Sequence, residues 1–537
     1  MKTRKILIFK KNLLTILLTS SIILSFTGCT QEEKSKLFVF CNDALYSLSI
    51  NEQLQIEKTK ITDPIVEIDK KTKTKFFCLG AEAPFLFPTP PFTSIDGEKM
   101  IIRCSIEKDR KESPLSCLET PPFYAMVNTD GSEKRLLLFQ PPKVEEDNGY
   151  KFWGSPWFSV SEKKYYYIIV KEKFSEGGKI TEHETQLWKA NFDGSDRKNL
   201  LKEKGVFYYP EQYYAYWEFG SFIESPDGEN ILFFFAKDPF SHYVEYLNLW
   251  LMNINTGEKR NLTEEIRKYL DDKEACIFET LFSPDGKKII MFIGYTNKMG
   301  IWSMNIDGSD KKNLTENLEN KELLYPFFLI SSDNKILFLK ELKNEDNNGN
   351  NYIDLDLDIW IMNIDGTDIG NLTEEGPKCR FPLGRYEPYI PGYKFQNIPA
   401  LPPGFIKFSP DSKKIVFKGR DKNGYSLWIM NSDGSEKKDL GKKIEDKFIK
   451  EFSEEDIDWL IDWLFVECWY PTFSPDGKYI FFLLPNKKFD WEEGNFENLQ
   501  YDLWVISQDG TEAKNLSEIC DLDIVYDFRF YFFICFD

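Results

Sequence analysis

Histidine is nearly absent from this chain: only His183 and His242 occur among its 537 residues. A Ser-His-Asp triad needs a histidine that lies between a carboxylate and an exposed nucleophile, and no Gly-x-Ser-x-Gly motif flanks either one. Two histidines are also too few for lyase chemistry that relies on several imidazole metal ligands. We assign both to solvated loops between the second and third strands of the repeat described below, so the sequence offers no catalytic histidine site.

Positive charge is also in short supply. Lysine and arginine number 68 against 87 aspartates and glutamates, which gives a formal net charge of −19. Nucleic-acid binding needs clustered Lys and Arg against the phosphates, and broad docking on anionic lipid needs the same kind of surface. We therefore expect neither a nucleic-acid partner nor electrostatic attachment to a membrane.

Paired cysteines are missing as well. The ten cysteines include no Cys-x-x-Cys pair, which argues against a zinc site. Several lie in apolar runs typical of strands, such as residues 38–41 and 533–536, and we interpret these as buried free thiols. Cys104 and Cys117 are the one pair that a short hairpin would join, so they are the disulfide that the sequence suggests.

The N-terminus has the pattern of a targeting segment. An apolar run, Leu13–Phe26, follows five basic residues, and the tetrapeptide FTGC ends it at Cys29. The basic start, the length of the apolar run and the small residues before the cysteine are those of a secretory signal. The tetrapeptide FTGC resembles a bacterial lipobox. This resemblance implies that residues 1–28 are a signal peptide and that Cys29 carries acyl chains, which anchor the chain without spanning the bilayer. An uncleaved membrane helix is the alternative, although the run is short for a hydrocarbon core of ~30 Å.

Seven copies of one sequence unit fill most of the remaining chain. The clearest copy is LFSPDGKKIIMFI from Leu281, followed by GIWSMNIDGSDKKNLT, which ends at Thr315. Further copies begin at Thr93, Trp157, Phe222, Ile330, Phe408 and Phe473. Self-similarity of this kind indicates a repeat architecture rather than several unrelated domains.

Each copy predicts four short strands. Ser-Pro-Asp-Gly predicts a turn, because Pro presets φ, Asp bonds nearby backbone and Gly accepts positive φ. The apolar run after it, residues 287–292 in the clearest copy, is a buried second strand, and Leu-Trp-x-Met-Asn is the third. Asp-Gly-Ser then predicts a hairpin turn, and Lys-Asn-Leu-Thr a fourth strand at the outer edge. One four-stranded sheet per repeat, repeated radially, is a propeller.

These motifs resemble the TolB-like repeat, a Pro-Asp variant of the WD-type propeller repeat. The resemblance implies an all-β fold: a β-propeller of four-stranded blades at residues 37–537, after a short linker at residues 29–36. Residues 37–64 look like the second to fourth strands of a blade, and residues 523–537 look like its missing first strand. The two ends would then share one blade and close the ring. This predicts eight blades; seven is the alternative if either end packs elsewhere.

One insert has the spacing of a calcium loop. In NEDNNGNNYIDLDLDIW, which begins at Asn344, oxygen-bearing groups fall at the ligand positions of such a loop. The candidate ligands are Asp346, Asn348, Asn350, the Tyr352 carbonyl and Asp354, with Asp356 or Asp358 as a later carboxylate. The spacing resembles the Asp-x-Asn-Gly-Asn loops of dockerin-like repeats. A solvated acidic hairpin tip is the alternative, and a calcium ion here would be structural. We predict no other cofactor.

Binding rather than catalysis is the function that these features favour. Aromatic insertions at residues 207–217 and 386–405 precede first strands, and exposed Tyr and Trp stack on sugars or anchor peptides; packing between blades is their alternative role. We expect a monomeric, exported lipoprotein, on the outer membrane if the cell has two, whose propeller binds an envelope protein, peptide or glycan. We expect no enzymatic activity. The alternative is a glycan- or peptide-active hydrolase or lyase with a carboxylate site.

Overall fold

The computed structural model describes the chain in segments that are mostly strands and their turns. They are residues 35–41, 44–50, 55–62, 65–69, 74–78, 92–94, 98–106, 123–128, 130–132, 134–137, 150–159, 161–174, 180–204, 206–207, 222–236, 248–272, 275–295, 298–318, 324–341, 353–383, 406–421, 424–442, 444, 471–474, 476–485, 500–520, 524–525 and 535–536. The predicted signal peptide, the predicted lipid-attachment residue Cys29 and most of the predicted calcium loop lie outside these residues. No helix within them is long and apolar enough to cross a membrane.

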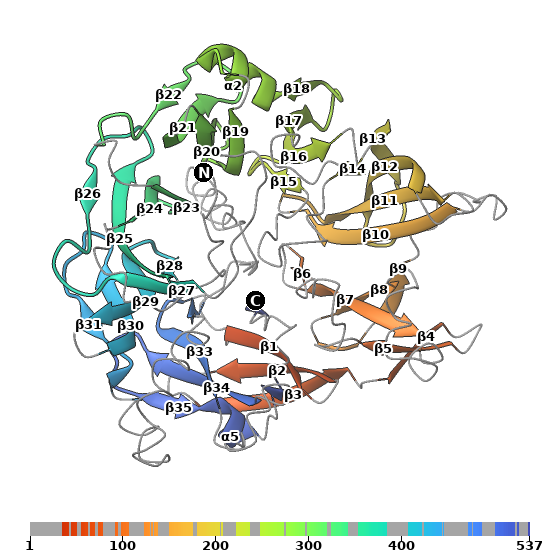
Figure 1. Cartoon of the computed structure of the whole chain (residues 1–537). Helices are drawn as coiled ribbons and strands as arrows, with labels where there is room; N and C mark the ends of the chain where they lie inside the picture. The colour runs from red at the N-terminus through yellow and green to blue at the C-terminus, as the bar shows by residue number, and fades with distance from the viewer. Residues whose placement is uncertain are drawn as a thin grey trace, which may run out of the picture.

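The described strands form eight antiparallel sheets that follow one another around a ring (Figure 1). We letter the sheets A to H in chain order. Sheet A holds β1 (Ser35–Cys41), β2 (Ala44–Ile50), β3 (Ile56–Thr62) and β37 (Cys535–Phe536). Sheet B holds β4 (Ile65–Asp69), β5 (Thr74–Cys78), β6 (Phe92–Thr93), β7 (Lys99–Ile106), β8 (Phe123–Asn128) and β9 (Lys134–Leu137).

Sheets C to E continue the ring in the same pattern. Sheet C holds β10 (Tyr150–Phe158), β11 (Lys164–Phe174), β12 (Ile180–Asn191) and β13 (Lys198–Lys204). Sheet D holds β14 (Val206–Phe207), β15 (Phe222–Glu224), β16 (Asn230–Ala236), β17 (Asn248–Asn253) and β18 (Lys259–Asn261), and helix α2 (Leu262–Leu270) follows it. Sheet E holds β19 (Cys276–Phe282), β20 (Lys288–Tyr295), β21 (Lys298–Asn305) and β22 (Lys312–Asn313).

Sheets F to H complete the ring. Sheet F holds β23 (Leu324–Ile330), β24 (Lys335–Glu341), β25 (Ile353–Asn363), β26 (Gly370–Asn371) and β27 (Cys379–Leu383). Sheet G holds β28 (Ile406–Phe408), β29 (Lys414–Asp421), β30 (Gly424–Asn431) and β31 (Lys438–Asp439). Sheet H holds β32 (Thr472–Phe473), β33 (Tyr479–Pro485), β34 (Gln500–Ser507), β35 (Ala513–Asn515) and β36 (Ile524–Val525), and helix α5 (Leu516–Cys520) follows β35.

The predicted strand exchange between the chain ends is present in sheet A. β37 pairs antiparallel with β1, with Leu37 opposite Phe536 and Phe38 opposite Cys535. Sheet A also contacts sheet H, because Lys58 Nζ donates to the Cys520 carbonyl at 2.7 Å. These contacts confirm the all-β propeller. The count of eight blades stays a prediction, because several sheets carry extra strands and long connections lie outside the described residues.

The Ser-Pro-Asp-Gly turn has the geometry that its residues predict. In sheet E, Ser283 Oγ donates to Asp285 Oδ1 at 2.7 Å and accepts from the Lys288 amide at 2.8 Å. Gly286 adopts a φ of +70°. The same serine–aspartate bond recurs in sheets D, F, G and H, at Ser225, Ser331, Ser409 and Ser474. Each turn is therefore closed by its own side chains.

The fourth strand is shorter than predicted. β22 covers only Lys312–Asn313, although Lys-Asn-Leu-Thr was expected to be one strand. The reason is that Thr315 Oγ1 accepts the Ile301 amide at 3.1 Å and so takes the place of a strand carbonyl. Leu314 meanwhile turns into the core, where it is buried.

The two hairpin turns of each sheet lie at the same end, because the first and third strands run in the same direction. In sheet E the Ile306 amide of the second turn donates to the Lys287 carbonyl of the first at 3.0 Å. We call this end of the ring the turn face and the opposite end the connection face.

The hydrophobic cores lie between neighbouring sheets rather than within one sheet. Each cluster joins two sheets: Met126 with Phe158 (B and C), Leu187 with Phe233 (C and D), Leu251 with Met304 (D and E), Leu281 with Phe328 (E and F), and Leu337 with Phe417 (F and G). The residue just before each turn serine packs onto the preceding sheet, as Phe282 does onto sheet D. A single sheet would leave both faces exposed, so the sheets are stable only as neighbours.

Gly434 tests this inter-sheet packing. It has a φ of +82° in the second turn of sheet G, and a Cβ added there would lie 3.2 Å from the backbone of Leu372 in sheet F. Gly434→Ala is expected to lower the free energy of unfolding by about 2 kcal/mol, since left-handed geometry and a backbone clash combine. Gly257→Ala is the matched control, because Gly257 has a similar φ of +73° and a Cβ there meets nothing within 4 Å. Urea unfolding measures both, and equal effects would contradict the packing.

The turn aspartates make the stability depend on pH. Hydrogen bonds from the Ser507 and Thr511 side chains, and from the Thr511 amide, lower the pKa of Asp509 to about 2. A folded pKa below the unfolded value of about 3.9 adds stability above that value, and this stability is lost as the pH falls toward 2. We expect the urea midpoint to fall between pH 5 and pH 2, and less steeply in Asp509→Asn. Identical pH slopes would contradict the assignment.

Candidate functional site

A buried carboxylate between sheets C and D is the most distinctive polar group of the described residues. Glu224 is the last residue of β15 and is only 7% exposed. It stands just before the turn Ser225, at a position where sheets C, E, F, G and H carry a buried apolar side chain. These apolar residues are Phe158, Phe282, Ile330, Phe408 and Phe473. Glu224 therefore directs a carboxyl group at the preceding sheet, at a position where those five sheets carry a core side chain.

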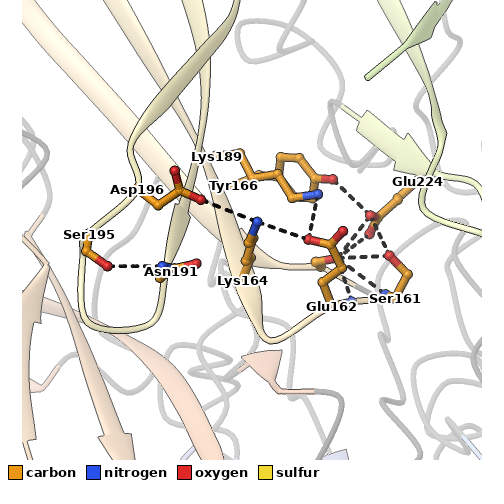
Figure 2. Close-up of polar contacts among 10 residues, drawn as sticks. Ser161, Glu162, Lys164, Tyr166, Lys189, Asn191, Ser195, Asp196 and Glu224 are labelled. Atoms are coloured by element: carbon orange, nitrogen blue, oxygen red, sulfur yellow. Dashed lines mark hydrogen bonds and ion pairs between the residues drawn. The ribbon is translucent and has the colours of Figure 1, made fainter. Parts of the chain in front are cut away.

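Hydroxyl groups of sheet C surround this carboxylate (Figure 2). Ser159 Oγ lies 2.9 Å from Glu224 Oε1 and 3.0 Å from Oε2. Ser161 Oγ donates to Oε1 at 3.0 Å, and Tyr166 OH donates to Oε1 at 2.8 Å. Three hydroxyl groups thus lie within hydrogen-bond distance of a carboxyl group that is only 7% exposed, as a buried polar group requires.

The sequence of the sheet C turn explains this arrangement. In the turns of sheets D to H the serine hydroxyl donates to an aspartate two residues later, as Ser283 does to Asp285. In sheet C that position is Ser161, and its Oγ lies 3.3 Å from the Ser159 Oγ. Glu224 supplies from the next sheet the carboxylate that this turn lacks. The turn of sheet D sits close against it, because a Cβ on Gly228 would lie 2.0 Å from Ser161 Oγ.

A second polar layer lies next to the cluster. Lys189 Nζ pairs with Glu162 Oε2 at 3.0 Å and lies 5.0 Å from the centre of the Tyr166 ring. Lys164 Nζ bridges Glu162 and Asp196, at 3.5 Å from each (Figure 2). Burial alone would raise the pKa of Glu162, but the hydrogen bonds and charges of Lys189 and Lys164 lower it.

Tyr166 acts as a donor in this site. Its ring is fully buried. Burial, followed by the charge of Glu224 and the hydrogen bond to it, raises the pKa of Tyr166 above its usual value. The phenol therefore keeps its proton at physiological pH and holds the carboxylate in place. The cluster thus links sheets C and D through hydrogen bonds to one buried carboxyl group.

The connection face is built differently from the turn face, because four sheets carry an extra strand there. β5 and β14 pair with the far ends of the second strands β7 and β16. β27 and β36 pair with the first residues of the third strands β25 and β34. In each case the extra strand lies at the end of the sheet opposite the hairpin turns.

β27 is held to the connection face by a buried ion pair. Lys378 Nζ donates to Asp358 Oδ1 at 2.6 Å, and Asp358 is only 4% exposed. Thr373 Oγ1 and Asn371 Nδ2 donate to the same carboxylate at 2.9 and 2.8 Å. The Lys378 backbone also exchanges two hydrogen bonds with Arg420 of sheet G, at 2.9 and 2.8 Å. This strand therefore joins sheets F and G.

The predicted calcium ligands fall mostly outside the described residues. Asp346, Asn348, Asn350 and Tyr352 lie outside them, whereas Asp354 and Asp358 belong to β25. The Asp358 carboxylate meets the Lys378 ammonium described above. Among the residues that the structure does describe, no group of three or more His, Cys, Asp and Glu side chains is arranged to hold a metal ion. The calcium loop stays a prediction.

The histidine placement needs one correction. His183 lies in β12, opposite Glu172 of β11, and not in a loop. The reason is that β11 and β12 run well past the repeat motif toward the connection face. His242 lies outside the described residues.

Solved structures of other propellers are similar to this chain at low identity. An oligogalacturonate lyase from Vibrio parahaemolyticus is 13% identical, with a TM-score of 0.40 over 78% of this chain and 92% of that one. TolB from Acinetobacter baumannii is 16% identical, with a TM-score of 0.28 over 59% and 58%. A prolyl endopeptidase is 11% identical, with a TM-score of 0.36 over 89% and 54%. No protein-family model and no curated protein matches the chain.

The ring of antiparallel sheets with its repeated serine–aspartate turns decides the fold. The chain is a β-propeller. Likeness at these identities concerns the fold alone, and the chain spans about half the length of the prolyl endopeptidase.

The expectation that this propeller is not an enzyme was wrong as an inference from its sequence. Structures similar to it include the oligogalacturonate lyase and the prolyl endopeptidase, so propellers of this kind occur in enzymes. At 13% and 11% identity the likeness does not assign either activity to this chain.

Proposed function

We propose that this protein is an exported lipoprotein whose propeller binds an envelope protein, peptide or glycan on its connection face. The observation that carries this proposal is the difference between the two faces. On the turn face, serine and aspartate side chains are used to close repeated tight turns. On the connection face, four of the sheets carry extra strands that differ from one sheet to the next.

Such asymmetry is what a binding module on a rigid repeat scaffold requires. Regular strands and turns fix the scaffold, and irregular segments at one end provide recognition. In the sequence, the aromatic insertion at residues 207–217 begins at the end of β14, and the one at residues 386–405 stands between β27 and β28. Both insertions therefore start from the connection face.

Binding is tested with variants that change residues on only one face of the ring at a time. The probes are immobilised polysaccharides and peptides from envelope material, measured by surface plasmon resonance. Replacing residues 208–217 by a Gly-Ser segment of equal length should remove the strongest response. Lys287→Ala with Lys413→Ala, two exposed changes on the turn face, should leave that response unchanged. Loss of binding in the turn-face variant alone would overturn the proposal.

The lipid anchor is tested separately. Cells grown with a labelled fatty acid should incorporate label into the parent protein but not into Cys29→Ser, and the variant should leave the membrane fraction. Label that persists in Cys29→Ser, or membrane attachment without label, would refute the anchor and leave the binding proposal standing.

A hydrolase or lyase with a carboxylate site is the second candidate. The observation that favours it is Glu224, a buried carboxylate with the Tyr166 hydroxyl at 2.8 Å. Assay on polysaccharides and peptides should then reveal turnover that Glu224→Gln removes and that the exposed control Glu229→Gln retains. Comparison of melting temperatures separates lost chemistry from lost folding. Turnover that is equal in both variants would exclude this carboxylate.

A further inference from the structure

The register of sheet B brings two cysteines opposite each other. Cys78 is the last residue of β5, and it faces Cys104 of β7 across the antiparallel pair. On the other side of β7, Cys104 is opposite Phe123 of β8. The cross-strand partner of Cys104 that carries a thiol is therefore Cys78. Cys117, which the sequence suggested as its partner, lies outside the described residues.

The geometry of an antiparallel pair matches that of a disulfide. Directly opposite residues of such a pair have Cα atoms roughly 4.5 or 5.5 Å apart. A disulfide joins Cα atoms that are about 4.4–6.8 Å apart. The Cα separation of directly opposite residues therefore falls within the range that a disulfide spans.

We propose that Cys78 and Cys104 form a cross-strand disulfide that fastens β5 to β7. β5 is one of the extra strands of the connection face, so this bond secures part of the face that the proposed function uses. The inference rests on the proposed export, because disulfides persist in oxidising compartments outside the cytosol. The partner of Cys104 is then Cys78, which lies earlier in the chain and on a separate strand, rather than Cys117.

The reaction is a thiol–disulfide exchange. The two thiols lose two protons and two electrons, and one S–S bond forms between Cys78 and Cys104. The electrons and protons pass to a disulfide donor, such as an oxidised thiol oxidoreductase or oxidised glutathione, whose own S–S bond breaks to give two thiols.

Peptide mapping without reduction tests the bond. The purified full chain is incubated with oxidised glutathione, alkylated, digested and analysed by mass spectrometry. We expect one linked peptide pair that contains Cys78 and Cys104. The pair should disappear in Cys78→Ser and in Cys104→Ser, and it should remain in Cys379→Ser, the matched change of a buried free cysteine. A Cys104–Cys117 link, or alkylation of both thiols after oxidation, would overturn the inference.

A thermal readout and a cellular readout complete the test. Dithiothreitol should lower the melting temperature of the parent by a few degrees and have no such effect on the Cys78→Ser, Cys104→Ser double variant.

In cells, acid quenching followed by alkylation reports whether the two cysteines are reduced or linked. A pair that links in vitro but stays reduced in cells would refute export and not the disulfide. A pair that fails to link in vitro refutes the disulfide itself.

Discussion

Glu224→Leu is expected to lower the free energy of unfolding by about 3 kcal/mol. The substitution keeps the size of the side chain and removes the acceptor of Ser159 and Tyr166, both of which are buried. A buried donor without an acceptor costs about 1–3 kcal/mol, and two such donors outweigh the gain of an apolar side chain in the core. Urea unfolding at neutral pH measures the loss.

A second substitution separates this explanation from simple loss of packing. Ser161→Asp gives the sheet C turn the carboxylate that other turns have, so Ser159 regains an acceptor in the double variant. We expect Ser161→Asp to restore about half of the stability lost in Glu224→Leu. In the parent background the same Ser161→Asp change should destabilise, because two carboxylates then share one buried site. Glu229→Gln, an exposed change on the neighbouring turn, is the control. Additive effects of the two substitutions would contradict the proposed role.

Removal of β37 is expected to have the other large effect. A chain that ends at residue 534 loses the pairing of Cys535 and Phe536 with β1, and it leaves the inner edge of sheet A unpaired. Closure of the ring removes such edges, so we expect hydrogen exchange of the β1 amides to rise by at least about tenfold, which corresponds to about 1.4 kcal/mol.

The control for this truncation is a chain that ends at Phe536 and lacks only Asp537. It keeps both register pairs of β37, so its β1 amides should remain protected. If the shorter chain exchanges no faster than this control, the two ends of the chain do not stabilise each other through sheet A.

Local features of the fold follow from the sequence because their causes are local. A turn such as Ser283 to Gly286 is closed by bonds among its own residues, so the motif alone predicts it. The shared sheet A could also be predicted, because residues 37–64 lack a first strand. Of the C-terminal residues expected to supply it, Cys535–Phe536 do so, whereas Ile524–Val525 pair with sheet H. The fourth strand was overestimated, because the Thr315 hydroxyl competes with a strand carbonyl and a propensity argument does not include that choice.

The site could have been found from two departures in the repeat. Glu224 replaces an apolar residue before one turn, and Ser161 replaces the aspartate of the preceding turn. Each departure looks unfavourable alone, and together they restore the missing bond between neighbouring sheets. By contrast, the extra strands β5, β14, β27 and β36 have no repeated motif. Their pairing depends on long-range register, which periodicity does not determine.

Small-angle X-ray scattering tests the closed ring most directly. A compact chain of this length should have a radius of gyration of about 24 Å, and a ring of radially arranged sheets should give the pair-distance distribution of a flattened disc. A pair-distance distribution with the long tail of an extended rod would show that the sheets stack in a line, and it would contradict the propeller on which every assignment of faces and junctions depends.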